Sequence, residues 1–142
     1  MAMLVRDLMV PTVLTLSPND AVQEADRSMR ESDDAAAVVL ENENVVGLLT
    51  EKEMAQAHNG ATVRDVMVKD PAVIAPGKAL PEAAQLLREK GQRFLPVVDG
   101  GMLVGIVSLP DIRKWANNNG DDEVQRVLTL EVRGYESQGP RA

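Results

Sequence analysis

Two short segments of the sequence combine a hydroxyl side chain with a carboxylate three residues later. Thr50 is followed by Glu53, and Ser108 is followed by Asp111. A hydroxyl at a helix start lies beside unpaired backbone N–H groups and the positive end of the helix dipole, where phosphate binds well. A carboxylate one turn later can accept hydrogen bonds from the hydroxyls of a ribose. The spacing therefore suits the sugar and phosphate of a nucleotide.

The same spacing also fits a capping box, in which the hydroxyl and the carboxylate bond free amides of their own helix. Glutamate is the more usual acidic partner in such a box than aspartate. Glu53 therefore favours a capping role and Asp111 a ligand role. The two motifs alone leave both interpretations open.

Both segments occupy matching positions in an internal repeat. Residues 5–56 align with residues 63–114 without a gap, and the aligned stretches begin VRDLMV and VRDVMV. The matches include polar residues and turn residues: Arg6 with Arg64, Asp7 with Asp65, Pro18 with Pro76, Glu24 with Glu82 and Gly47 with Gly105. A unit of this size buries too little apolar surface to be comfortably stable alone. We therefore expect one copy over 1–60 and a second over 61–118 to share a core around a pseudo-twofold axis.

Each copy has the same predicted order of elements, β-α-β-β-α, after a helical turn at its start. In the first copy the elements are expected at residues 13–16, from 21 onward, 36–40, 45–49 and 51–57. In the second copy they are expected at residues 73–75, 79–90, 95–98, 102–107 and 109–116. The predicted fold class is therefore α/β in the broad sense (α+β), a tandem β-α-β-β-α repeat with pseudo-twofold symmetry.

Residues 119–142 form a C-terminal extension that is harder to interpret. Residues 121–132 fit a helix on Val124, Val127 and Leu128, and they also alternate as a strand would. Helix is the favoured interpretation. Residues 134–142 are polar and lack periodicity, so we expect a loose, disordered tail.

Composition excludes several classes of protein. The 142 residues are 44% hydrophobic and 26% charged, as in an ordinary globular protein. No apolar run approaches the roughly 20 residues that a membrane span needs, and the start MAMLVRD lacks the long apolar stretch of a signal peptide. We therefore expect a cytoplasmic protein without membrane insertion. A net charge of -7 disfavours broad nucleic-acid binding.

The sequence gives little support for a metal site or a catalytic nucleophile. It has no cysteine and one histidine, His58, which falls in the linker between the copies. A single imidazole without thiols cannot build the usual zinc sites or catalytic triads. We expect no catalytic residue and no metal site, and we interpret His58 as a solvated linker residue.

The ordered motifs together resemble a known family. The ungapped pair of units, the paired VRDLMV and VRDVMV, the FLPVVDGG hairpin and the terminal GIVSLPD resemble a CBS-domain pair over about residues 4–116. The resemblance implies one disc-like regulatory module rather than an enzyme. It implies an adenosine-containing ligand such as AMP, ADP, ATP or S-adenosylmethionine in clefts between the motifs, with no required cofactor, and often a homodimer.

The resemblance also assigns binding roles by position. Ser108 is expected to face the phosphate and Asp111 the ribose hydroxyls, while Gly105 lets the backbone approach the ligand. Arg93, just before the LPVV strand, is expected either to reach phosphate or to be a solvated surface arginine. The expected adenine slot consists of apolar residues that could equally be core: Ala72, Val73, Leu95 and Pro96.

The first copy departs from this pattern. Glu53 stands where aspartate is expected, and Ala35 stands opposite Arg93. A longer carboxylate has to fold back to reach the same diol, and the matching arginine is missing. We therefore expect one competent cleft, at Ser108 and Asp111, and an empty or altered site at Thr50.

Three functions follow from these patterns. The leading one is a sensor whose bound nucleotide changes the angle between the copies, so that an effector protein reads the altered surface. The alternative is a ligand-free dimeric scaffold or partner-interaction module, in which the motif residues only cap helices. An enzyme is disfavoured, because the sequence shows no nucleophile with its base, no Walker-type loop and no metal triad.

Overall fold

The computed structural model describes residues 3–129, so the predicted tail over 134–142 lies outside the described residues. The first copy contributes α1 (Val5–Leu8), β1 (Thr15–Leu16), α2 (Val22–Ser32), β2 (Ala36–Glu41), β3 (Asn44–Thr50) and α3 (Glu51–Met54). The second contributes α4 (Val63–Val66), β4 (Val68–Lys69), α5 (Leu80–Lys90), β5 (Phe94–Asp99), β6 (Met102–Ser108) and α6 (Leu109–Asn119). Mixed α and β elements in repeated order confirm the predicted fold class.

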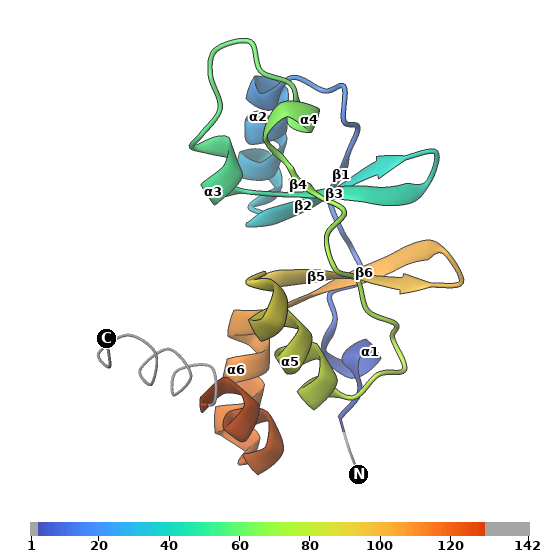
Figure 1. Cartoon of the computed structure of the whole chain (residues 1–142), viewed down its shortest axis with the longest axis vertical. Helices are drawn as coiled ribbons and strands as arrows, with labels where there is room; N and C mark the ends of the chain where they lie inside the picture. Colours follow the sequence, from blue (N-terminus) through green and yellow to red (C-terminus); the bar gives the residue numbers. More distant parts are fainter. Residues whose placement is uncertain (1–2, 130–142) are drawn as a thin grey trace, which may run out of the picture.

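The elements form two lobes stacked along the long axis, each with a hairpin facing the middle of the molecule (Figure 1). One sheet has the strand order β1-β2-β3-β4, with β1 and β2 parallel and the other neighbours antiparallel. The other sheet is the antiparallel hairpin of β5 and β6. The register shifts between Val39 and Leu40 in one hairpin and between Val97 and Val98 in the other, at matching repeat positions.

Each lobe is completed by a segment from the other copy. The α4 and β4 segment lies in the first lobe, where Val68 pairs with Leu48 of β3. The α1 helix lies in the second lobe (Figure 1), and Val10 just after it exchanges two hydrogen bonds with Ile106, at 2.8 and 3.0 Å. The chain therefore crosses between lobes twice, and neither copy completes its own sheet.

Apolar side chains form a core in each lobe and a third cluster between the lobes. The third cluster contains Ala36, Val38 and Leu48 from the first sheet, packed with residues that include Phe94, Leu103 and Ile106 from the second hairpin. The two copies therefore share apolar contacts through this central cluster, while each lobe also has a core of its own, where a single shared core was expected.

The three long helices α2, α5 and α6 end at residues in the left-handed backbone conformation, Asp33, Gly91 and Gly120. α5 ends at Gly91, whose φ is +64°, as predicted. The helix predicted over 51–57 is shorter than expected, because α3 ends at Met54. Residues 122–129 are helical, which confirms the favoured interpretation of the extension as far as it is described. Val124 of this helix is completely buried in the second core.

No helix among residues 3–129 is long and apolar enough to cross a membrane.

Candidate functional site

The first hydroxyl–carboxylate motif is a closed capping box at the start of α3. Thr50 is the N-cap residue, and its backbone N–H donates to the Glu53 carboxylate at 2.8 Å. The Thr50 hydroxyl donates to the same carboxylate oxygen and accepts from the Lys52 N–H at 3.3 Å. The partly buried Glu53 side chain is thus used by its own helix start. The structure therefore supports the capping interpretation for this copy.

The second motif is only half closed. Ser108 is the N-cap residue of α6, and its Oγ accepts a hydrogen bond from the Asp111 N–H at 3.2 Å. The return bond is missing: within residues 3–129, the Asp111 carboxylate has neither a hydrogen bond nor an ion pair. Asp111 is exposed, and its carboxylate is free to accept hydrogen bonds from a ligand.

The prediction of unpaired backbone amides at this helix start is wrong. The Leu109 N–H donates to the Arg93 carbonyl at 2.8 Å, Pro110 has no N–H, and the Asp111 N–H is held by Ser108. A phosphate at this position would therefore depend on side-chain donors, such as the Ser108 hydroxyl and a guanidinium, rather than on the helix backbone.

Arg93 lies next to the Ser108 end of the hairpin. Phe94 pairs directly with Ser108 across the two strands, and the Arg93 carbonyl bonds the first residue of α6. The Arg93 side chain is exposed and, among the described residues, forms no ion pair. Arg93, Ser108 and Asp111 are thus brought to the same edge of the second lobe. Their roles as ligand contacts stay predictions.

Gly105 has a structural role that needs no ligand. A Cβ atom at this position would lie 2.9 Å from the Val10 carbonyl oxygen and 2.8 Å from the Met9 sulfur. The glycine therefore makes room for the crossing segment after α1, which bonds to Ile106. Its predicted approach to a ligand is not needed to explain it.

The predicted adenine slot is only partly assembled. Leu95 is completely buried in the second core, so its side chain does not line an open slot, and Pro96 is buried too. Val73 is 40% exposed and lines a hollow of about 310 Å³ beside α5. Ala72 is half-buried, and both its N–H and its carbonyl are bonded by the side chain of Gln92. Sequence reasoning missed Gln92.

The sequence contains a feature that could have pointed to the structural role of Gln92. Pro96 lies inside a predicted strand, and proline cannot donate the hydrogen bond that a neighbouring strand expects. A polar side chain nearby is one way to replace such a donor. Gln92, four residues earlier, is that side chain.

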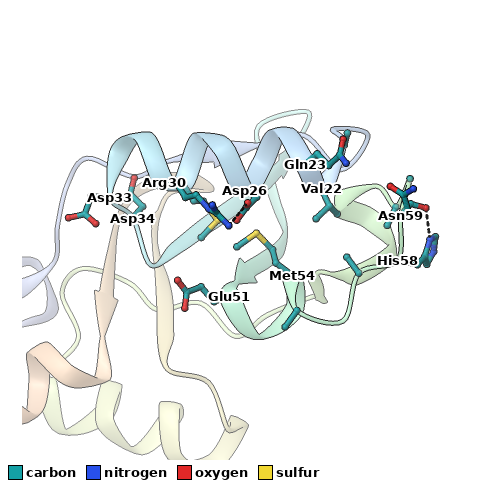
Figure 2. A pocket seen from close by; sticks show the side chains of 16 residues that line it. Val22, Gln23, Asp26, Arg30, Asp33, Asp34, Glu51, Met54, His58 and Asn59 are labelled. Carbon is teal, nitrogen blue, oxygen red and sulfur yellow. Dashed lines mark hydrogen bonds and ion pairs between the residues drawn. The ribbon is translucent and has the colours of Figure 1, made fainter.

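A larger hollow than the one beside α5 lies in the first lobe. A groove of about 670 Å³ runs between α2, α3 and the linker, lined by residues that include Met29, Met54 and Glu51. Figure 2 shows Met54 facing the α2 helix across this groove, beside the Arg30–Asp26 ion pair of 3.0 Å. His58 lies at its end on the exposed linker, as predicted. Neither this groove nor the smaller hollows beside α5 and between the hairpin tips is lined by Ser108 or Asp111.

Comparison with sequence families gives two matches within the chain. The CBS domain family matches residues 5–60 and again residues 63–118. The CBS domain-containing protein YhcV of Bacillus subtilis is 37% identical over 131 residues, which cover 88% of this chain and 92% of YhcV. The inosine-5'-monophosphate dehydrogenase of Korarchaeum cryptofilum is 36% identical over 102 residues, 70% of this chain but only 21% of that enzyme.

Solved structures share the fold. The CBS domain protein NE2398 superposes with a TM-score of 0.75 at 26% identity, over 82% of this chain and 98% of that one. CBSX2 in complex with AMP superposes with a TM-score of 0.70 at 26% identity, over 81% and 96% of the two chains. The CBS domain pair of MJ0100, solved with 5'-methylthioadenosine and S-adenosyl-L-methionine, shares the fold with a TM-score of 0.78 at 21% identity, over 83% and 98%.

Proposed function

The chain belongs to the CBS-domain family as a tandem pair, and from this premise we propose that it is a regulatory module that binds an adenosine-containing nucleotide beside Ser108 and Asp111. The observation that carries the proposal is the half-closed start of α6, where the Asp111 carboxylate is exposed and unbonded within the described residues. The carboxylate of Glu53, at the matching position, already accepts a hydrogen bond from the Thr50 N–H of its own helix start. The second copy thus keeps a ligand group that the first copy has lost.

The proposed roles follow from the chemistry of the side chains. Asp111 accepts hydrogen bonds from the two ribose hydroxyls, and the Ser108 hydroxyl donates to a phosphate oxygen. Arg93 supplies positive charge for an anion on a chain whose net charge is -7, and its guanidinium can donate two parallel hydrogen bonds to phosphate. AMP, ADP, ATP and S-adenosylmethionine all carry the ribose and adenine; AMP and S-adenosylmethionine are named with related structures.

We propose that the module regulates an effector protein and performs no reaction itself. The dehydrogenase match covers a fifth of that enzyme, so it carries no activity over to this chain. A ligand shifts the balance between two arrangements only through its different affinity for them. The crossing segments of α1 and α4 join the lobes, and they are the elements through which binding at one lobe would alter the angle to the other.

A ligand-free scaffold remains the second candidate, and a specific observation favours it. The three hollows described above lie away from Ser108 and Asp111. In that case the α6 start would act as a helix cap alone.

Calorimetric titration separates the two functions. We expect saturable binding of at least one of AMP, ADP, ATP and S-adenosylmethionine to the wild type, and a loss of at least about tenfold in affinity in Asp111→Ala. Glu53→Ala is the matched control and should bind as the wild type does. Absence of binding by all four compounds would overturn the nucleotide proposal in favour of the scaffold. Equal losses of affinity in both variants would overturn the assignment of the ligand contact to Asp111.

We also propose that the protein forms a homodimer through the groove between α2 and α3. In the second lobe, the matching face is filled by the longer α6, whose Leu109 and Ile112 are buried with Leu87 of α5. In the first lobe α3 has four residues against eleven in α6, and the groove stays open. A second copy can cover the apolar residues of this groove, among them Val22, Met29 and Met54, around a twofold axis. A related CBS-CP12 protein is hexameric.

A further inference from the structure

The sheet of the second lobe lacks a hydrogen bond that the first lobe has. The Ile74 N–H donates to the Pro96 carbonyl at 3.0 Å, and the Val98 N–H donates to the Ile74 carbonyl at 2.9 Å. The next bond of this parallel ladder would run from residue 96 to the carbonyl of Ala72. Proline has no N–H to donate, so the ladder stops there.

The first lobe shows the bond at the matching positions. There the Val38 N–H donates to the Leu14 carbonyl at 3.0 Å, and β1 runs beside β2 over the next residues. Pro96 therefore accounts for the missing bond in the second lobe. It leaves a gap in the backbone hydrogen bonding between Ala72 and the start of β5.

The side chain of Gln92 fills this gap. Its Oε1 accepts from the Ala72 N–H at 2.8 Å, while its Nε2 donates to the Ala72 carbonyl at 3.3 Å and to the Phe94 carbonyl at 3.0 Å. The orientation of the amide is fixed, because one side of the gap presents a donor and the other sides present acceptors. Gln92 lies in the connection between α5 and β5, so its side chain can leave the gap without breaking a strand.

The carboxamide offers Ala72 an acceptor and a donor side by side. Adenine offers the same pair along one edge, with N1 as the acceptor and the N6 amino group as the donor. Guanine and hypoxanthine carry the opposite pair, an N1–H donor and an O6 acceptor. In the ring orientation that a ribose held at Asp111 imposes, they would set donor against donor and acceptor against acceptor. Half-buried backbone groups left unpaired in this way cost free energy.

We propose that Gln92 occupies the base position of the slot in the free protein and is displaced by adenine, so that Ala72 and Gln92 together determine a preference for adenine over guanine. Adenine restores both bonds to Ala72 that Gln92 gives up, whereas guanine restores neither. This inference rests on the proposed function and identifies the groups that select the base of its ligand.

NMR spectroscopy of the labelled wild type tests the displacement directly. On saturation with AMP, we expect the Gln92 side-chain amide signals to move towards those of a solvent-exposed glutamine, while the Ala72 backbone amide keeps its protection from exchange. GMP at the same concentration should leave the Gln92 signals in place. AMP binding that leaves the Gln92 amide unmoved would overturn this inference and leave the nucleotide proposal intact.

Calorimetry on Gln92→Ala provides an independent test, with Gln85→Ala as the control. Gln85 is an exposed glutamine of α5 that bonds Glu89 and not Ala72. We expect Gln92→Ala to bind AMP about tenfold more tightly than the wild type, because no side chain has to be displaced, and Gln85→Ala to bind as the wild type does. Unchanged or weaker AMP binding in a folded Gln92→Ala would overturn the inference. Absence of binding of AMP, ADP, ATP and S-adenosylmethionine in every form would overturn it together with the proposed function.

Discussion

At the scale of single residues, the two repeats differ in their matching carboxylates: one is bonded within its own helix start, and the other is free to bond a ligand. Glu53 accepts hydrogen bonds from the N–H and the hydroxyl of Thr50, whereas Asp111 accepts none within residues 3–129. The same repeat position thus serves stability in one lobe and stays open to a ligand in the other.

This difference predicts unequal losses of stability. We expect Glu53→Ala to lower the free energy of unfolding by about 1 kcal/mol, because α3 loses its capping box. Asp111→Ala should lower it by less than about 0.5 kcal/mol, since an exposed side chain without a partner is removed. Urea unfolding of the two variants beside the wild type measures both values. Equal losses would contradict the distinction between cap and ligand group.

Asp65 provides a prediction for pH. The backbone N–H and the hydroxyl of Thr62 donate to its carboxylate, and these bonds lower the pKa of Asp65 below its usual 3.8. Because the pKa is lower in the folded chain, the stabilising effect is present at neutral pH and is lost as the pH falls through the folded value. Carbon-detected NMR titration should show the shift in the wild type and a smaller one in Thr62→Val, which keeps only the backbone bond. Titration of the wild type at or above 3.8 would refute it.

At the scale of elements, Gly105 shows how a strand is shaped by a segment distant in sequence. A methyl group here would meet the Val10 carbonyl oxygen at 2.9 Å, and that oxygen is fixed by its bond from the Ile106 N–H. We expect Gly105→Ala to destabilise the protein by about 1–3 kcal/mol through overpacking. Gly77→Ala is the control, because the nearest atom lies 3.9 Å away. The midpoint of chemical denaturation measures both, and a Gly105→Ala protein as stable as the control would contradict the crossing.

Most elements could be predicted from local patterns alone. The hairpin expected over 36–40 and 45–49 forms over 36–41 and 44–50, and Gly91 ends α5 as expected. The strand expected at 73–75 reduces to a single bridge at Ile74. The reason is physical and not local: its partner strand contains Pro96, which removes a ladder bond that apolar periodicity does not reveal.

At the scale of the whole molecule, the repeat predicted a shared core but not how the chain reaches it. Alignment of the two copies shows that the sequences of α1 and α4 match, but it does not show which lobe each helix joins. In the structure Val5 of α1 is completely buried in the second core, and Val63 of α4 is completely buried in the first. The site depends on this exchange, because the crossing at Val10 flanks the strand that leads to Ser108.

The proposed dimer gives the last prediction, at the same scale. Met54 of α3 and Met29 of α2 both line this groove. The Met29 residue is almost completely buried. A charge placed among the apolar side chains of this groove must be desolvated on association, so Met54→Glu should separate the copies. Met102→Glu is the matched control, because Met102 is 60% exposed at a hairpin tip away from the groove.

Light scattering coupled to size exclusion measures the outcome. The wild type and Met102→Glu should have twice the chain mass of 15.4 kDa, and Met54→Glu should have the single-chain mass. A wild type at 15.4 kDa would refute the dimer, whereas a Met54→Glu dimer would show that the copies associate through another face. Nucleotide binding by the Met54→Glu monomer should persist, because Ser108 and Asp111 lie in the other lobe from this groove.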